Sequence, residues 1–144
     1  MIRKATLEDI DALNELLKSL FEQENEFQAD AKLQIKALKK IINSKKIGDI
    51  FVYERDKKVI AMVNVLYSIS TALGKKVAIL EDMIVLKKYR QKGYGTKLLS
   101  YVLKRLEKDG VKRITLLSDF DNDKAHEFYK KQGFKKSTMV VLRK

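Results

Sequence analysis

Two glycines one residue apart, Gly93 and Gly95, separate an apolar run from an amphipathic segment. Glycine permits a tight turn and lets a ligand approach the backbone closely. If a helix begins near Gly95, its first backbone N–H groups lack partners within the helix and favour an anion, usually a phosphate. With Arg90 before the glycines, the pattern Arg90-x-x-Gly93-x-Gly95 predicts a phosphate cradle. Short glycine patterns are common, so an ordinary strand-to-helix turn is the alternative.

The flanking segments predict how this loop is held. Residues 77–86 are mainly apolar and indicate a strand that leads into the loop. Leucine and valine recur at helical spacing over residues 98–106, and Gly110 is placed to end that helix in a left-handed conformation. Residues 111–118 indicate a further strand, parallel to the first. The loop therefore belongs to a β–loop–α–β unit.

The part of the chain before this unit predicts strands and two helices. A short strand at residues 1–5 precedes two helices, which start at the capping residues Thr6 and Asp30. β-Branched and aromatic residues on both sides of a charged turn indicate an antiparallel hairpin over residues 50–67.

The part after the unit predicts one more helix and one more strand. Asn122 can cap a helix over residues 123–132, and Gly133 can end it. Residues 134–142 indicate a final strand. The expected order is β-α-α-β-β-β-α-β-α-β, in a single α/β domain over residues 1–144.

Composition narrows the class of protein. Hydrophobic residues make up 45% of the 144 residues, which is typical of a globular domain, and there is no cysteine for a disulfide or a thiolate metal site. No apolar run is long enough to cross a bilayer, and the first residues do not resemble a signal peptide. We expect a soluble, cytoplasmic protein with no metal and no membrane partner.

The formal net charge of +12 is unevenly distributed. Residues 87–144 contain 17 Lys and Arg against six Asp and Glu, whereas residues 5–30 contain eight acidic residues and one lysine. A basic half can bind a polyanion, either a phosphorylated cofactor or nucleic acid. Solvated basic and acidic faces are the simpler alternative.

A second motif runs from Asn122 to Phe134. Asn122 and Tyr129 are seven residues apart, which is two helical turns, so both can lie on one helix face. Ala125 between them is small enough to let a ligand pass close to the helix. The fixed positions of the motif are Asn122, Ala125, Phe128, Tyr129, Gly133 and Phe134.

Taken together, the two motifs resemble the GNAT superfamily of acyl-CoA-dependent N-acetyltransferases. That family has a strand followed by Arg/Gln-x-x-Gly-x-Gly/Ala and a helix, and later Asn-x-x-Ala-x-x-Phe-Tyr-x-x-x-Gly-Phe. The element order agrees as well, so the resemblance covers essentially the whole chain. It implies a mixed, mostly antiparallel sheet in which a central parallel pair of strands splays around the cofactor.

The resemblance implies acetyl-CoA as cosubstrate, and nucleic acid is then not needed to explain the basic half. The backbone at the end of the strand before the loop would bind the pantetheine arm and polarise the acetyl carbonyl; these residues are Met83, Ile84 and Val85. Backbone amides of the loop would bind the pyrophosphate; these residues are Gln91, Lys92, Gly93, Tyr94, Gly95 and Thr96. The remaining implied cofactor contacts are Arg90, Asn122 and Phe128.

The implied reaction is direct attack of a neutral amine on the thioester. An alkylamine has a pKa of about 10.4, so it must lose a proton first. By resemblance Tyr129 is the acid for the leaving thiolate, with a packing role as the alternative. The run Leu80-Glu81-Asp82 resembles polyamine acetyltransferases and implies Glu81 as the base. Since strand side chains alternate, at most one of the two acids should face the cleft, and Asp82 is expected to be structural.

The sequence leaves the acceptor amine open. In this superfamily the first two helices help to form the acceptor side, which here includes Glu22, Glu24 and Glu26. These acids favour a cationic acceptor, such as a polyamine, an aminoglycoside-like amine or a basic peptide end, and a solvated acidic helix is the alternative. Family habit suggests a homodimer. The rival function is a non-catalytic module on the same fold that senses CoA or binds a polyanion.

Overall fold

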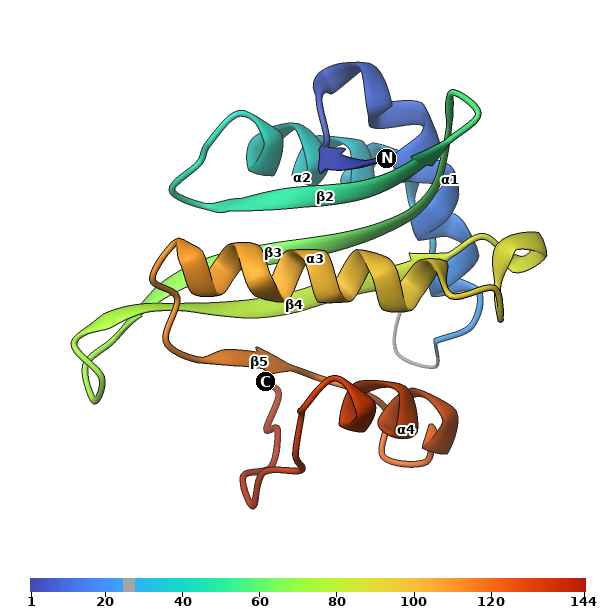
Figure 1. Cartoon of the computed structure of the whole chain (residues 1–144). Coiled ribbons are helices and arrows are strands. Elements are labelled where there is room, and N and C mark those ends of the chain that lie inside the picture. Colours follow the sequence, from blue (N-terminus) through green and yellow to red (C-terminus); the bar gives the residue numbers. More distant parts are fainter. Residues whose placement is uncertain (25–27) are drawn as a thin grey trace.

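A five-stranded sheet in the order β1-β2-β3-β4-β5 forms the centre of the molecule (Figure 1). The computed structural model describes residues 1–24 and 28–144. The strands are β1 (Ile2–Lys4), β2 (Gly48–Arg55), β3 (Lys58–Ser70), β4 (Lys75–Val85) and β5 (Ile114–Leu116). The helices are α1 (Ile10–Phe21), α2 (Ala31–Ile42), α3 (Tyr94–Lys108) and α4 (Asp123–Lys131), with short 3₁₀ turns η1 (Leu7–Asp9) and η2 (Lys87–Tyr89).

The first four strands pair antiparallel, and β4 pairs parallel with β5. The parallel pairing covers only three residues on each strand, Ala78–Leu80 against Ile114–Leu116. Beyond Leu80 the two strands separate, so one edge of β4 has no neighbouring strand there among residues 1–24 and 28–144. The expected splayed parallel pair is therefore confirmed.

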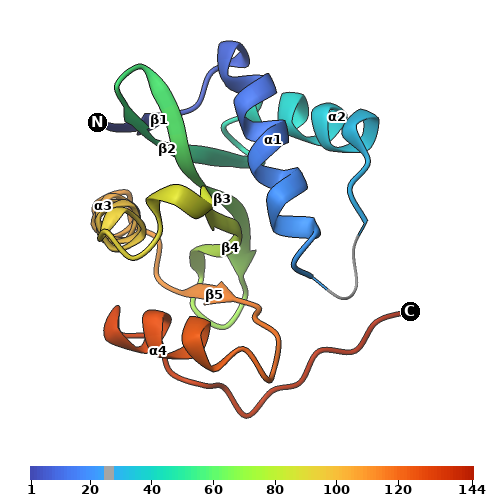
Figure 2. The ribbon, with the colours of Figure 1, turned by 90° about the vertical axis from the view of Figure 1, so that its right-hand side faces the viewer.

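Helices cover both faces of the sheet (Figure 2). On one face, Leu98, Leu99 and Val102 of α3 pack with Val63 and Leu80, and we call this group the α3-side cluster. On the other face, side chains of α1 and α2 form a second group, the α1/α2-side cluster, whose members include Leu13, Leu16, Leu38, Met62 and Ile84. The sheet thus separates two buried apolar clusters.

Local sequence signals end and begin the helices as expected. Asp9 accepts a hydrogen bond from the backbone N–H of Thr6 at 2.7 Å, and Asp30 accepts one from Leu33 at 3.2 Å. Gly110 ends α3 with a φ of 81°, in the left-handed region that favours glycine. No helix within residues 1–24 and 28–144 is both long and apolar enough to cross a membrane.

The final strand expected over residues 134–142 does not form, and this prediction was wrong. No pairing with the sheet occurs after α4, so β5 is the edge strand and the parallel pair lies at the edge rather than in the centre. The apolar side chains of this segment are largely exposed, with Met139 86%, Val140 81% and Leu142 90% exposed. Strand propensity reflects how a side chain fits a pleated, half-buried surface, and this segment does not lie on one.

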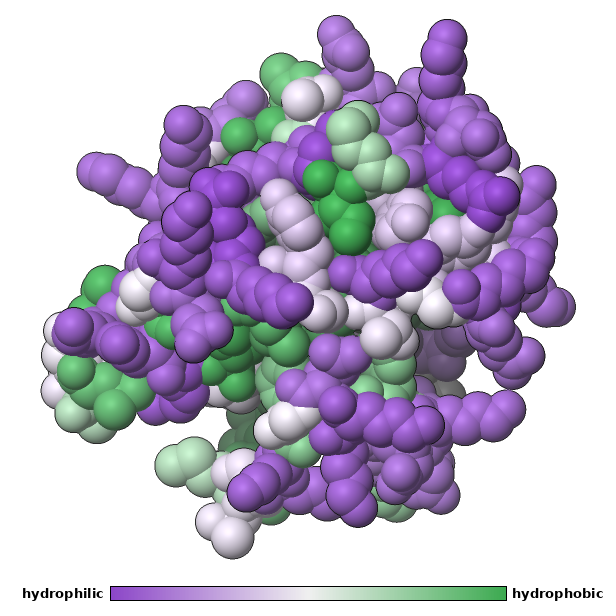
Figure 3. Space-filling model, in the orientation of Figure 1, coloured by the Kyte–Doolittle hydropathy of each residue, from purple (hydrophilic) through white to green (hydrophobic). Residues whose placement is uncertain are grey.

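Charged and polar side chains cover most of the face that carries α3 (Figure 3). An apolar exception lies at the turn between β3 and β4, where Ile69 is 71% and Leu73 is 47% exposed. Exposed apolar residues of this kind are normal on folded proteins, and this turn lies at the opposite end of β4 from the glycine loop.

Candidate active site

A cleft of about 1180 Å³ opens where β4 and β5 separate. Its walls come from segments far apart in the sequence: the end of α1, the second half of β4, the glycine loop, the segment between β5 and α4, α4 itself and the C-terminal segment. The cleft therefore exists because the parallel strands pair for only three residues.

The glycine loop forms one wall of the cleft. Gly93 is the N-cap of α3 and has a φ of 81°, and Gln91 has a φ of 59°. Left-handed residues in such a turn direct backbone N–H groups toward one side, which makes an anion-binding concavity. The first helical hydrogen bond runs from the Lys97 N–H to the Gly93 carbonyl, so the amides before Lys97 are those that a helix leaves unpaired. A Cβ at Gly93 would meet no atom within 4 Å, so the space beside it is open.

Arg90 supplies a positive charge beside this loop. Its Nε donates a hydrogen bond to the Val85 carbonyl at 2.8 Å, which holds the guanidinium against the end of β4. Its Nη2 is buried and has no hydrogen-bond partner among the described residues. A buried, unpartnered charged donor is costly, and an anion in the cradle would satisfy it.

Gly95 allows three side chains to meet over the first turn of α3. A Cβ at this position would lie 3.4 Å from Val85, 3.5 Å from Met83 and 3.6 Å from Phe128. These are ordinary contact distances, so Gly95 adjoins packed side chains, whereas Gly93 adjoins open space. Ile84 alternates to the opposite face, where it joins the α1/α2-side cluster.

Two residues of the loop have side chains outside the cleft lining. Tyr94 is buried and packs edge-on against Tyr53, with ring centroids 5.1 Å apart, and Lys92 is exposed. Only their backbone amides were expected to serve the site, so this arrangement is compatible with that expectation. The side chains of Gln91 and Thr96 do belong to the lining.

Helix α4 forms the opposite wall. Asn122 caps it by accepting a hydrogen bond from the Ala125 N–H at 3.1 Å. Phe128 and Tyr129 line the cleft one turn later, with ring centroids 5.2 Å apart. Burial raises the pKa of Tyr129 to about 12, so this phenol is protonated at neutral pH.

Glu81 and Asp82 lie on the same face of β4, which corrects the expectation that only one could face the cleft. Asn64 of β3 pairs with Glu81, whereas Met62 pairs with Ile84, so one residue of β3 stands opposite both Asp82 and Met83. This is a β-bulge, in which one extra residue breaks the alternation of side chains. Both carboxylates line the cleft.

The acidic acceptor side is only partly formed by the residues expected. Glu24 lines the cleft after the end of α1, and the exposed Glu22 does not. Glu26 lies outside the described residues. Phe21 and the C-terminal residues Val140 and Val141 also line the cleft, and they were missed because no local pattern indicates them.

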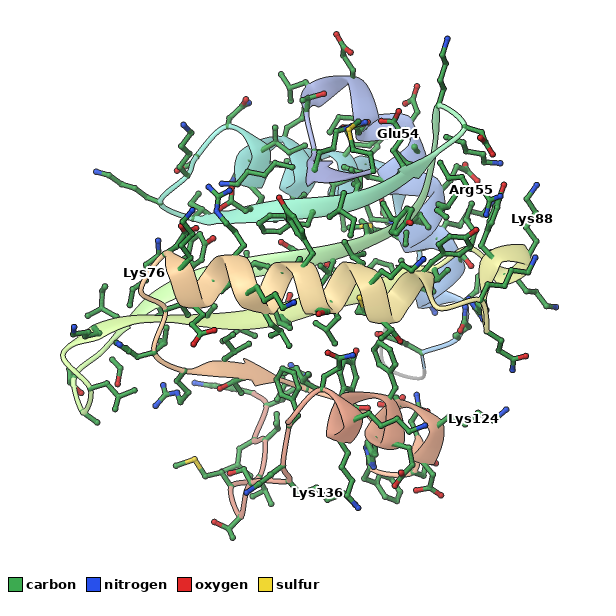
Figure 4. All side chains as sticks on the ribbon, viewed as in Figure 1. Glu54, Arg55, Lys76, Lys88, Lys124 and Lys136 are labelled. Atoms are coloured by element: carbon green, nitrogen blue, oxygen red, sulfur yellow. The ribbon has the colours of Figure 1, made fainter. Side chains whose placement is uncertain are left out.

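Lys88 and Lys124 lie near the same end of the molecule (Figure 4). Lys88 projects from η2, beside the glycine loop, and Lys124 projects from the first turn of α4. Lys124 also belongs to the cleft lining. Within the described part of the chain, no group of three or more His, Cys, Asp and Glu side chains is arranged to hold a metal ion.

Comparison with known proteins identifies the family. A family model described as "Acetyltransferase (GNAT) family" matches residues 10–134. The chain belongs to the GNAT acetyltransferase family.

Individual relatives agree with this assignment. A protein named "Uncharacterized N-acetyltransferase YhfO", from Bacillus subtilis (strain 168), is 29% identical over 92 residues, which are 64% of this chain and 62% of that relative. The match therefore spans less than two thirds of the relative's length.

Solved structures share the fold. One is a possible acetyltransferase from Clostridium difficile 630, with a TM-score of 0.91, 21% identity and coverage of 100% of this chain and 95% of that chain. Another, described as a "predicted acetyltransferase with acetyl-CoA" from Clostridium acetobutylicum, has a TM-score of 0.82, 17% identity and the same coverage of both chains. At these identities the likeness establishes the GNAT fold.

We expect sodium pyrophosphate to raise the Tm of the wild-type protein by a few degrees, because an anion bound only to the folded state stabilises it. Arg90→Gln should remove most of this rise, since it removes the buried unpartnered donor. Differential scanning fluorimetry at constant ionic strength measures the effect. Lys92→Gln is the matched control, because it removes an exposed positive charge of the same loop, and it should keep the rise. Equal responses in both variants would contradict the assignment of Arg90 to the cradle.

Proposed function

We propose that this chain transfers an acetyl group from acetyl-CoA to a primary amine, as a single acetyltransferase domain over residues 1–144. The observation that carries the proposal is the set of groups that line the cleft from one end to the other. The cleft runs from a glycine loop and a buried Arg90 donor, which has no partner in the described part of the chain, to the Tyr129 phenol and two carboxylates. Membership of the GNAT family and a similar fold solved with acetyl-CoA support it.

The cofactor would be held mainly by backbone groups. In this proposal the amides of residues 91–96 bind the pyrophosphate, together with the Arg90 guanidinium. The free edge of β4 at Met83–Val85 receives the pantetheine arm, since no strand pairs with it there. The Val85 carbonyl already accepts from Arg90, so the arm would use the groups before it. Asn122 and Phe128 of the facing wall complete these contacts.

Bound acetyl-CoA supplies the acetyl group as a thioester, and the side chains of the cleft manage two protons. An ammonium that resembles lysine must lose one proton before its nitrogen can attack. The sequence prediction gives that proton to Glu81, whose exposed side chain lines the cleft. The second proton leaves the nitrogen as the amide forms.

Tyr129 would donate toward the departing sulfur. Its pKa of about 12 keeps the phenol protonated, which a donor requires. This phenol is a weaker acid than an ordinary thiol, whose pKa is about 8.5. If it gives its proton to the sulfur, the Tyr129 oxygen must therefore receive another proton. The attacking nitrogen provides that proton, because it loses its basicity on becoming an amide.

We propose a cationic acceptor, such as a polyamine, an aminoglycoside-like amine or a basic peptide end. Glu24, Glu81 and Asp82 give the acceptor side of the cleft several carboxylates. Negative charges in a cleft with low-dielectric walls raise the local concentration of a positively charged ligand. Glu22, which the sequence also assigned to this side, lies outside the cleft lining, and Glu26 lies outside the described residues.

Gly93→Val should abolish binding of acetyl-CoA, because a side chain there would occupy the open space of the cradle. Calorimetry measures binding, and thiol release with spermidine, kanamycin and a lysine-containing peptide then measures turnover in the same samples. Gly110→Val is the matched control, since Gly110 has the same φ of 81° and the same open surroundings. It should lose similar stability and keep acetyl-CoA affinity.

The outcomes separate the candidate functions. Binding with turnover supports the enzyme. Binding without turnover of any amine favours a non-catalytic CoA-sensing module, and no binding favours a polyanion-binding role for the basic half of the chain. Normal binding by Gly93→Val would show that the cradle is wrongly placed.

Tyr129→Phe should lower kcat by about 10²–10⁴-fold, because the leaving thiolate loses its donor, while acetyl-CoA affinity changes little. Steady-state thiol release and calorimetry measure the two quantities. Tyr101→Phe is the control, since Tyr101 is 40% exposed and lies outside the cleft lining. A kcat for Tyr129→Phe equal to that of the control would leave Tyr129 with a packing role only.

Glu24→Lys should raise KM for spermidine by on the order of tenfold, because it reverses a charge beside the acceptor path. KM for an arylamine, which is neutral at the same pH, should change little. Glu22→Lys makes the same charge change outside the cleft lining and serves as control. Unchanged KM values for both amines would sink the proposal of a cationic acceptor.

A further inference from the structure

The bulge in β4 joins a buried amide to a carboxylate at the floor of the cleft. Asn64 of β3 is only 3% exposed, and its Nδ2 donates a hydrogen bond to Oδ2 of Asp82 at 3.2 Å. Oδ1 of Asn64 is buried and has no partner among the described residues. A native protein rarely leaves a buried side-chain acceptor unsatisfied, so this one calls for an explanation.

Asp82 also has an unusual backbone. Its φ of 53° lies in the left-handed region, where a residue with a side chain is uncommon. Backbone conformations of this kind persist where the surrounding structure requires them, and they cluster at functional sites. Here the conformation turns the Asp82 carboxylate toward Asn64 and onto the face that Glu81 shares.

We infer that Asp82, aimed by Asn64, takes the proton from the acceptor ammonium, and that Asn64 is the positioning residue of this pair. The inference rests on the proposed acetyl transfer and deepens it, because it moves the role of base from the exposed Glu81 to the half-buried Asp82. Glu81 then contributes its charge to binding the cation.

The proton balance of the step is complete. The Asp82 carboxylate removes one proton from the ammonium and becomes a carboxylic acid. The neutral nitrogen then forms a C–N bond with the acetyl carbon as the C–S bond breaks. The second nitrogen proton replaces the one that Tyr129 donates to the sulfur. Asp82 returns its proton to water, so one amide, one thiol and one released proton result.

Asn64 suits both protonation states of Asp82. Its Nδ2 donates to the carboxylate in the present arrangement. After a half-turn of the amide, Oδ1 can accept the proton of the neutral carboxylic acid, since an asparagine presents a donor and an acceptor of similar shape.

The electrostatics of the pocket support this assignment. The pKa of Asp82 is raised from its ordinary 3.8 to about 6, mainly by burial and to a lesser extent by the charge of Glu81, while the Asn64 hydrogen bond acts in the opposite direction. The higher pKa makes the Asp82 carboxylate a stronger base toward the acceptor ammonium. The other titratable or charged groups of the cleft lining are Glu24, Tyr89, Arg90, Asp119, Lys124, Tyr129 and Arg143.

The pair makes a signed prediction for two variants. Asn64→Leu removes the N–H that favours the carboxylate, so the pKa of Asp82 should rise. Glu81→Gln removes a neighbouring negative charge, so the pKa should fall. The value of kcat/KM should be lost at low pH, where Asp82 becomes protonated. The midpoint of this loss should follow the pKa of Asp82, to higher pH in Asn64→Leu and to lower pH in Glu81→Gln.

The experiment has two readouts. Carbon-13 NMR of aspartate carboxyl groups follows titration directly in the whole protein, and Asp82→Asn assigns the Asp82 signal by its loss. Kinetics with acetyl-CoA and the fastest amine of the panel follow the pH profile. Asp82→Asn should lower kcat/KM by about 10²–10⁴-fold, and Glu81→Gln by far less. Calorimetric binding of acetyl-CoA checks that each variant is folded, and Asn64→Ala, which also removes the N–H, replaces Asn64→Leu if the latter fails this check.

The results distinguish this inference from the proposed function. If the wild type turns over an amine but Asp82→Asn retains activity, or if Glu81→Gln abolishes the acid side of the profile, the inference is overturned and the acetyltransferase proposal stands. An Asp82 carboxyl that titrates at the ordinary value, unmoved by Asn64→Leu, also overturns it. If the wild type turns over no amine, both proposals fall together.

Discussion

The separation of β4 from β5 after three paired residues is the constraint on which the rest of this structure depends. Within a sheet, an interior strand forms hydrogen bonds to neighbouring strands on both sides. Its backbone N–H and C=O groups are then not available to bind a ligand. Here the second half of β4 keeps its pairing with β3 on one side and loses it on the other. That loss creates a ligand-sized opening lined by backbone groups, inside an otherwise regular fold.

The elements around the opening follow from it. Helix α3 can begin at the end of β4 because Gly93 and Gln91 turn the chain in left-handed conformations. Helix α4 faces the opening from the far side because the segment after β5 carries the chain away from β4. Phe128 of α4 then approaches Gly95 of α3, where a Cβ would lie 3.6 Å from its ring. The cleft is thus a product of strand divergence and of two helix starts.

Much of this arrangement could be predicted from the sequence, because its signals are local. The caps at Asp30 and Asn122 and the left-handed glycines act within a few residues, and each appears where expected. The final strand could not be predicted correctly, because pairing needs a neighbour as well as strand propensity. The bulge at Asp82 was also missed, since it depends on a hydrogen bond with Asn64, which lies eighteen residues earlier in the chain.

The sheet divides the buried apolar side chains into two clusters, and this division gives the fold a modular character. Residues of the α1/α2-side cluster, such as Leu38, can be exchanged without any contact to α3, whose apolar face packs on the opposite side of the sheet. Met62 and Ile84 belong to this cluster and lie on strands β3 and β4, so an exchange there can affect the other face only by moving these strands. A protein engineer could therefore vary the surface beside Glu24 by repacking one layer and keep the glycine loop as a fixed scaffold. The same independence would let related chains diversify one side of the sheet while the other stays constant.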